Sequence, residues 1–156
     1  MTSTSAPPSR RVLAVASGGG HWVQLLRTRP AFDGHDLTFV TVREDYRSDV
    51  GDDARFRVVV DATEWQRLLL IKLFLQVCWI VVRTRPHAVV TTGAAPGLMA
   101  ILAGRLIGAR TMWIDSIANV EQISKSGRIA RRLASHTLTQ WPDLAGDGVD
   151  YAGSVL

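Results

Sequence analysis

Cysteine is almost absent from this chain of 156 residues, since Cys78 is the only one. A single thiol excludes an internal disulfide framework and any metal site built from four cysteines. Lysine is nearly as scarce, because only Lys72 and Lys125 occur among the 18 basic residues. Residues 1–10 are rich in Ser, Thr and Pro and lack the apolar core of a signal peptide. We therefore expect a disordered lead-in over residues 1–10, followed by a protein of the reducing cytoplasm.

The formal net charge of +4 is concentrated in the middle of the chain. Residues 61–134 carry ten basic and four acidic side chains, whereas the last 22 residues carry only three acids. Signatures of RNP, zinc-finger and helix-turn-helix proteins are absent, so nucleic acid is not the expected partner. An anionic membrane surface or a substrate that carries phosphate fits this charge better.

Short runs of apolar and β-branched residues alternate with helical patterns, and no repeat or linker interrupts residues 11–156. Strands are expected at 11–16, 37–41, 56–60, 88–92, 111–114 and 137–141. Helices are expected at 21–27, at 64–84, from 96 to about 107 and at 129–134. This alternation favours an α/β fold with a Rossmann-like, doubly wound and mostly parallel sheet. We predict a single domain over 11–156, too small to hold both halves of a two-domain enzyme.

Two turns of small residues follow expected strands, and each one opens the next helix. The first is Ser17-Gly-Gly-Gly20, and the second is Thr91-Thr-Gly-Ala-Ala-Pro-Gly97. The first has neither the dinucleotide-binding spacing GxGxxG nor the P-loop spacing GxxxxGK(S/T). Glycines let a backbone approach a ligand closely, and the N–H groups at a helix start attract anions. Since doubly wound sheets bind ligands beyond the carboxyl ends of their strands, we predict a shared crevice for a diphosphate or a sugar. Plain strand-to-helix turns without a ligand are the alternative.

Three polar side chains stand beside these expected turns and strand ends. His21 can act as a general base on a sugar hydroxyl or bind phosphate, or it is a capping or solvent-exposed histidine. Asp115 and Ser116 directly follow the fifth expected strand. Asp115 can bind a sugar hydroxyl or assist as a base, but both residues are equally suited to capping the next helix.

The longest apolar stretch covers residues 65–82, and Arg67 and Lys72 interrupt it. These two charges argue against a helix that spans a bilayer. At about 100° per residue, Lys72, Gln76 and Arg83 form one narrow polar stripe, which leaves most of the helix surface apolar. One side must pack on the sheet, and the other needs a partner chain, a bilayer interface or full burial in the core. We favour a membrane surface, with basic side chains that snorkel to its headgroups.

Arg128, Arg131 and Arg132 recur at helical spacing and are expected on one face of the helix over 129–134. Anionic lipid headgroups or a lipid-linked diphosphate would be attracted to this cluster, and a solvated basic face is the plain alternative. The expected membrane-contact residues are Lys72, Trp79, Arg83, Arg128, Arg131 and Arg132.

Five motifs taken together resemble one family. They are Val15-Ala-Ser-Gly-Gly-Gly-His-Trp-Val-Gln-Leu-Leu26, the turn over 91–97, Trp113-Ile-Asp-Ser-Ile-Ala-Asn-Val120, Ser126-Gly-Arg128 and Thr139-Gln-Trp-Pro-Asp143. In this order they resemble the acceptor-side, membrane-anchoring subunit of split GT-B glycosyltransferases. That family acts in the assembly of dolichol-linked oligosaccharides and has bacterial counterparts in exopolysaccharide and capsule synthesis. The resemblance implies that the chain folds as the N-terminal half of a GT-B enzyme.

The resemblance also implies an activity that needs two chains. The enzyme would transfer a sugar, N-acetylglucosamine or another hexose or uronic acid, from a UDP-sugar to a lipid-diphosphate-linked acceptor, with inversion and without a metal. No cofactor is implied, because the UDP-sugar is the donor substrate and would sit mostly on a separate chain that supplies the C-terminal half. The chain would lie at the cytoplasmic face of a membrane as a peripheral or monotopic protein, and residues 151–156 would help to dock the partner. A non-catalytic nucleotide- or phosphate-binding module and a pure membrane adaptor are the alternatives.

By the same resemblance, His21 activates the acceptor, and Asp115 contacts the acceptor or assists as a base. No metal ligand is implied. The residues expected to bind the acceptor or its phosphates are Ser17, Gly18, Gly19, Gly20, Thr92, Gly93, Ala94, Gly97, Ser116 and Asn119.

Overall fold

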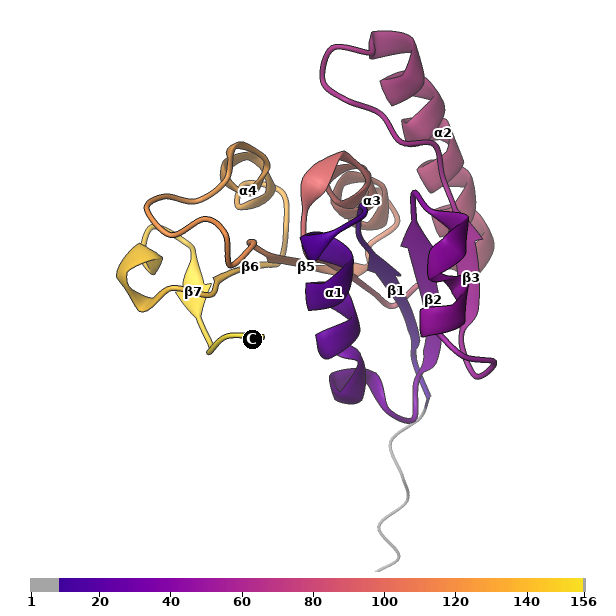
Figure 1. Ribbon diagram of the computed structural model, residues 1–156, viewed down its shortest axis with the longest axis horizontal. Helices are drawn as coiled ribbons and strands as arrows, with labels where there is room; N and C mark the ends of the chain where they lie inside the picture. The colour runs from indigo at the N-terminus through magenta and orange to yellow at the C-terminus, as the bar shows by residue number, and fades with distance from the viewer. Residues whose placement is uncertain (1–8, 156) are drawn as a thin grey trace, which may run out of the picture.

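A single parallel sheet organises the computed structural model, which describes residues 9–155. Its strands lie in the order β3-β2-β1-β4-β5-β6-β7, and every neighbouring pair is parallel (Figure 1). The strands are β1 (Arg11–Val15), β2 (Asp36–Thr41), β3 (Arg55–Val58), β4 (Ala88–Thr91), β5 (Arg110–Ile114), β6 (His136–Thr139) and β7 (Asp150–Tyr151). The strand order reverses between β1 and β4, as in a doubly wound sheet. The predicted fold class is therefore confirmed, whereas most of the expected lead-in, residues 1–8, lies outside the described residues.

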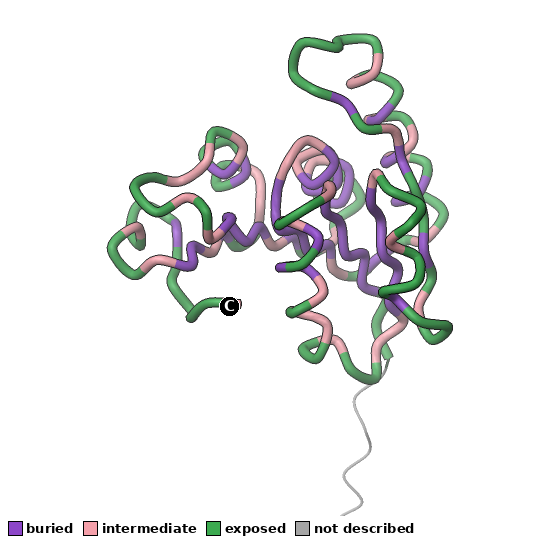
Figure 2. Tube along the Cα trace, viewed as in Figure 1, coloured by how far each residue is buried: buried purple, intermediate pink, exposed green. Residues whose placement is uncertain are grey.

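Helices cover both faces of the sheet. They are α1 (Gly20–Arg27), α2 (Arg67–Thr84), α3 (Ala94–Leu106) and α4 (Lys125–Ala130), with short 3-10 helices η1 (Arg29–Phe32), η2 (Glu44–Asp49) and η3 (Pro142–Leu144). Leu13 and Val15 of β1 pack against α2 and α3, whereas Val12 and Ala14 pack against α1 on the other face. Successive side chains of a strand point to opposite faces, so a central strand must be apolar at nearly every position. The buried residues accordingly follow the central strands in Figure 2.

Three segments differ from the sequence-based expectation. The basic helix expected over 129–134 is present but lies earlier in the chain, because α4 runs from Lys125 to Ala130. It begins where the Ser124 hydroxyl accepts a hydrogen bond from the Gly127 N–H. Arg131 and Arg132 therefore lie beyond the end of α4. The long helix starts at Arg67 rather than at residue 64, since residues 63–66 form a turn closed by a bond from the Gln66 N–H to the carbonyl of Thr63. Strand β7 was not expected, because only two exposed residues pair with β6.

Helix α2 packs on the sheet with one side only. Its sheet-facing side buries the side chains of Leu73, Val77, Ile80 and Val81. The opposite side, here called the outer face of α2, consists of Leu68, Ile71, Leu75, Trp79 and Val82. These side chains recur every three or four residues and stay exposed, with Leu68 at 83% and Trp79 at 59%. Within residues 9–155, no helix is both long and apolar enough to cross a bilayer.

Candidate functional site

The residues of the predicted crevice lie at the carboxyl edge of the sheet. The loops that follow β1, β4 and β5 are neighbours there, because these three strands lie side by side. Helices α1 and α3 both begin at this edge, with Gly19 and Gly93 as their N-cap residues, and neither helix start carries a side-chain cap. Two helix N-termini therefore point toward one place, where their free backbone N–H groups favour an anion.

The glycine turn after β1 is hydrogen-bonded to η2. The N–H of Gly19 donates to the Tyr46 hydroxyl at 2.9 Å. A Cβ on Gly18 would lie 3.3 Å from the Arg43 side chain, so this glycine permits close packing. Gly19 has φ +64°, Gly20 begins α1, and half-buried Ser17 accepts a bond from the Thr41 hydroxyl through its carbonyl. The conformation of this turn is therefore fixed by hydrogen bonds at both of its ends.

His21 connects the two predicted turns. Its Nδ1 lies 2.7 Å from the carbonyl oxygen of Thr92, and the Thr92 hydroxyl donates to the carbonyl of His21 at 2.7 Å. Because a carbonyl oxygen can only accept, Nδ1 is the donor in this bond, and in the neutral form of the ring the lone pair therefore lies on Nε2. The ring is half-buried. A lone pair on Nε2 is a proton acceptor for any hydroxyl that comes within hydrogen-bond distance.

Gly93 makes room for this histidine. Its φ is +134°, and a Cβ at this position would lie 2.6 Å from Cε1 of His21. The following Ala94 adopts φ +64°, an uncommon conformation for a residue with a Cβ. Gly97 is buried on α3, where a Cβ would lie 2.0 Å from the Thr91 hydroxyl oxygen, so this glycine allows α3 to pack closely on β4.

Asp115 is 2% exposed and accepts four hydrogen bonds. The Trp113 indole donates to Oδ1 at 3.0 Å, and the Asn119 amide donates to Oδ2 at 3.0 Å. Ser124 donates twice, from its hydroxyl to Oδ1 and from its backbone N–H to Oδ2 at 2.9 Å. A carboxylate has about four acceptor positions, and here all are used within the protein. Asp115 thereby ties β5 to the loop that leads into α4.

A buried amide pair next to Asp115 was missed in the sequence. Gln24 Oε1 accepts from the Ile117 N–H at 3.0 Å and from Gln140 Nε2 at 2.6 Å. Gln140 Nε2 also donates to the Asp115 carbonyl at 2.9 Å, and its Oε1 accepts from the Val155 N–H at 3.0 Å. One network therefore joins α1, the loop after β5 and the C-terminal segment. Two sequence signals were present, a glutamine on the apolar side of α1 between Trp22 and Leu25, and the place of Gln24 and Gln140 within two of the five motifs.

Ser116 and Asn119 complete this loop. The Ser116 hydroxyl accepts from the Ala118 N–H at 3.3 Å and from Gln24 Nε2 at 3.2 Å. Asn119 is engaged with Asp115 through its amide. Both side chains therefore line the loop beside the crevice, where they fix its shape.

The expected membrane-contact residues fall into two groups. Lys72, Trp79 and Arg83 are exposed on α2, and the Arg83 guanidinium lies 5.5 Å from the centre of the Trp79 ring. The second group, Arg128, Arg131 and Arg132, is exposed at and beyond the end of α4. Helix α3 lies between α2 and α4, so the two groups are not adjacent (Figure 1). A contact at 2.6 Å between Lys125 Nζ and Glu64 Oε2 nevertheless joins the start of α4 to the segment before α2.

The sheet order, the reversal between β1 and β4 and the two small-residue turns define a Rossmann-like, doubly wound α/β domain. A family model described as "Oligosaccharide biosynthesis protein Alg14 like" matches residues 43–155. The chain belongs to this family of Alg14-like oligosaccharide biosynthesis proteins.

A curated relative carries the same family name, and two solved structures share the fold. The chain is 25% identical over 169 aligned positions to the UDP-N-acetylglucosamine transferase subunit ALG14 of Eremothecium gossypii, covering 88% of this chain and 75% of the relative. The crystal structure of Acinetobacter baumannii MurG has a TM-score of 0.77 at 12% identity, and the match covers 94% of this chain and 46% of MurG. The UDP-N-acetylglucosamine 2-epimerase of Rickettsia bellii has a TM-score of 0.67 at 13% identity, with 95% and 46% covered. The chain thus spans slightly under half of the length of these two proteins.

Proposed function

We propose that this chain is the acceptor-side subunit of a two-chain UDP-N-acetylglucosamine transferase that acts on a lipid-diphosphate-linked acceptor. Membership of the Alg14-like family supports this role, as does the name of the Eremothecium relative. The observation that carries the proposal is the position of His21 between the two small-residue turns, where Nδ1 is bonded to Thr92 and Nε2 makes no hydrogen bond within residues 9–155. A second chain with the UDP-sugar site would complete the enzyme, because the chain corresponds to slightly under half of MurG.

In the proposed reaction, His21 is the general base. A hydroxyl oxygen of the acceptor sugar attacks the anomeric carbon of the UDP-sugar, and the bond between this carbon and the UDP oxygen breaks. The hydroxyl proton moves to Nε2 of His21, and the configuration at the anomeric carbon is inverted by the single displacement. No metal is needed for this proton transfer, which contributes roughly 10²–10⁴-fold to such rates. The positive charge that develops on the ring is stabilised by the hydrogen bond from Nδ1 to the Thr92 carbonyl.

The acceptor diphosphate is proposed to lie at the starts of α1 and α3. The backbone N–H groups of Gly20 and Ala94 begin these helices, and neither start is occupied by a side-chain cap. Helix N-termini stabilise anions through these N–H groups and the helix dipole. Asp115 acts in this proposal by positioning the loop that holds Ser116 and Asn119, since its own oxygens already accept four bonds.

The outer face of α2 is proposed to rest on an anionic bilayer surface at the cytoplasmic face of the membrane. Its exposed apolar side chains are flanked by Arg67, Lys72 and Arg83, all of which are exposed. An apolar helix face bordered by basic residues matches the interface of a membrane with acidic lipids. The bilayer would then supply the second apolar neighbour that α2 lacks in the structure.

The test is co-expression with candidate chains that carry a UDP-sugar site, followed by transfer assays with several UDP-sugars. We expect a stable complex that is active only when both chains are present, and a loss of activity in His21→Ala. Tight binding of a nucleotide by the chain alone would instead favour a nucleotide-binding module. Unchanged turnover of a His21→Ala complex would favour a membrane adaptor.

A further inference from the structure

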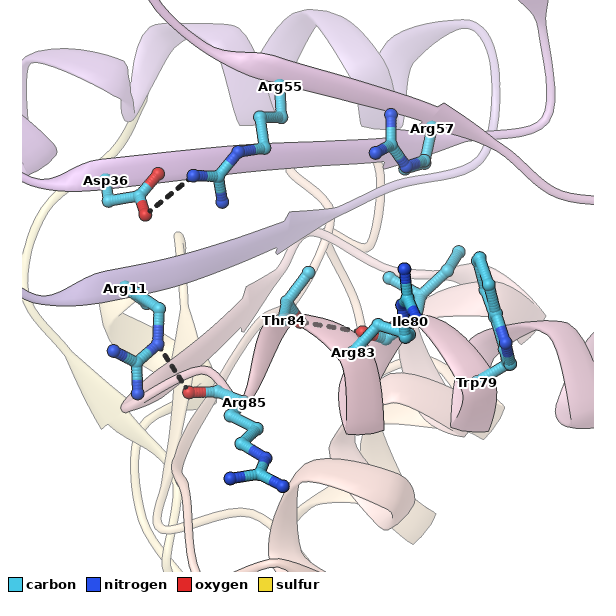
Figure 3. A pocket seen from close by; sticks show the side chains of 9 residues that line it. All are labelled: Arg11, Asp36, Arg55, Arg57, Trp79, Ile80, Arg83, Thr84 and Arg85. Atoms are coloured by element: carbon cyan, nitrogen blue, oxygen red, sulfur yellow. Dashed lines mark hydrogen bonds and ion pairs between the residues drawn. The ribbon is translucent and has the colours of Figure 1, made fainter.

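An arginine-lined cavity lies at the amino edge of the sheet, at the opposite end of the strands from the crevice (Figure 3). Its volume is about 520 Å³. Arg11, Asp36 and Arg55 are the first residues of β1, β2 and β3, and the end of α2 closes the other side. The charged residues that line it are Arg11, Asp36, Arg55, Arg57, Arg83 and Arg85.

Most of this positive charge is not neutralised within the cavity. Among residues 9–155, Asp36 is the one carboxylate in the lining, and it lies 3.2 Å from a guanidinium nitrogen of Arg55. Arg11 donates to the carbonyl of Arg85 at 2.9 Å, and Arg57 donates to the carbonyl of Phe56 at 2.9 Å. Carbonyl groups orient a guanidinium without cancelling its charge. Four positive charges therefore remain in one concave place, and an anion that binds there lowers their mutual repulsion.

The arginines come from separate elements and are arranged around one space. Arg11 is on β1, Arg57 is on β3, and Arg83 is in the last turn of α2. Arg85 follows α2 in the left-handed conformation, with φ +43°, at a position where glycine is the usual residue. A guanidinium is a planar fork that binds phosphate oxygens in pairs, so several arginines around one space suit a phosphate group.

An apolar groove continues from this cavity along α2. It has a volume of about 500 Å³ and is lined by side chains of β3 and α2, among them Val58, Leu68, Ile71 and Leu75. Arg57 and Trp79 line both spaces. A phosphate-binding cavity that opens into an apolar groove matches a molecule with an acidic head and a hydrocarbon chain.

We propose that the arginine cavity binds the phosphate headgroup of one anionic membrane phospholipid, with an acyl chain of this lipid in the adjoining groove. The inference rests on the membrane contact proposed above and makes it specific, because a discrete site differs from a diffuse attraction to charge. The site is separate from the acceptor crevice, which lies beyond the other ends of the same strands.

The first experiment measures binding of soluble short-chain lipids to the full chain by calorimetry, below the concentration at which these lipids form micelles. Dihexanoyl phosphatidylglycerol is expected to bind with one-to-one stoichiometry. Dihexanoyl phosphatidylcholine and inorganic phosphate are each expected to bind at least about tenfold more weakly, because one lacks the net charge and the other the chain. Equal affinity for inorganic phosphate would overturn the lipid assignment, and so would equal affinity for phosphatidylcholine.

The second experiment compares two pairs of substitutions that remove the same charge. Arg57→Gln with Arg85→Gln empties part of the cavity, whereas Arg27→Gln with Arg47→Gln removes two exposed arginines outside the cavity lining. We expect the cavity pair to weaken phosphatidylglycerol binding about tenfold or more, and the control pair to change it less than about twofold. Equal losses in both pairs would overturn the proposal, because net charge alone would explain them.

Two further measurements keep the proposal testable if the glutamine variants fold poorly. Arg57→Lys with Arg85→Lys keeps the charge but removes the fork, so an intermediate affinity is expected even if the glutamine pair folds poorly. Flotation of the chain with vesicles of phosphatidylcholine and phosphatidylglycerol measures attachment to a bilayer rather than the stoichiometry of lipid binding. Flotation without one-to-one lipid binding overturns the discrete site and leaves the membrane contact standing. One-to-one lipid binding without flotation overturns the membrane contact alone.

Discussion

His21 and Thr92 are joined by two hydrogen bonds that run in opposite directions, each 2.7 Å long. The two residues are far apart in the sequence and belong to turns that follow β1 and β4. The pair therefore holds the two strand-to-helix turns together and fixes the orientation of the imidazole at the same time. If His21 is the base as proposed, its ring needs no rearrangement when a hydroxyl arrives.

Replacement of His21 tests the proposed base directly. His21→Ala should lower kcat of the two-chain complex roughly 10²–10⁴-fold, because the proton acceptor is lost. The measurement is the initial rate of sugar transfer at saturating donor and acceptor. His136→Ala is the matched control, since His136 is exposed at the start of β6, and its rate should stay within about twofold of the original. Equal rates in all three proteins would remove His21 from the mechanism.

Gly93→Ala tests the space that the imidazole occupies. The new Cβ would lie 2.6 Å from Cε1 of His21, and φ +134° disfavours any residue with a Cβ. We expect the free energy of unfolding to fall by about 2 kcal/mol or more and transfer activity to fall with it. Urea unfolding and transfer rates measure the two effects.

Gly108→Ala separates backbone strain from displacement of the histidine. Gly108 has φ +79°, but a Cβ there would meet no atom within 4 Å. This variant should lose about 1–2 kcal/mol of stability and keep its transfer rate. If Gly93→Ala behaves in the same way, the contact with His21 has no role in activity.

Asp115→Asn tests the buried carboxylate. An amide group presents N–H donors to Asn119 and Ser124, which themselves donate to Asp115 in the structure. The free energy of unfolding should therefore fall by about 2–4 kcal/mol. Exposed Asp143→Asn is the control, with an expected change within about 0.5 kcal/mol. The free energy of unfolding is measured by denaturation in urea, and an unchanged midpoint for Asp115→Asn would contradict the positioning role.

The outer face of α2 can be tested without harming the core. Ile71 and Leu75 are 57% and 62% exposed, so Ile71→Ser with Leu75→Ser should leave the melting temperature nearly unchanged. Flotation with anionic vesicles should fall at least about tenfold, because each methylene that enters the bilayer contributes about 0.8 kcal/mol. Val23→Ser with Ile107→Ser removes two side chains of similar exposure elsewhere and should float normally. Equal flotation of both double variants would contradict membrane contact through α2.

The fold could be predicted because strands covered on both faces are apolar throughout. Leu13 and Val15 face one layer and Val12 and Ala14 the other, so β1 is visible as a continuous apolar run. The juxtaposition of the two small-residue turns followed from topology, since parallel strands place their following loops at one edge. The short, polar β7 offers no comparable pattern, which is why it was missed.

Side-chain partners could not be predicted to the same degree. Gln24 and Gln140 are separated by 116 positions and meet only because α1 and the end of β6 converge at one edge. From the residues alone, a ligand role and a capping role for Asp115 were equally favoured. Its four hydrogen bonds come from one residue of β5, Trp113, and from two residues of the loop that follows, Asn119 and Ser124. The arginine cavity could not be predicted from the sequence either, because Arg11, Arg57 and Arg85 are distant in sequence and share no motif.

The ion pair between Glu64 and Lys125 places the start of α2 beside the loop that leaves Asp115. If α2 lies flat on the bilayer as proposed, the crevice is held close to the headgroup layer. The reaction then takes place in two dimensions, with enzyme and lipid-linked acceptor meeting by lateral diffusion. Under that condition the surface density of the acceptor, rather than its concentration in bulk solution, governs how often the two meet.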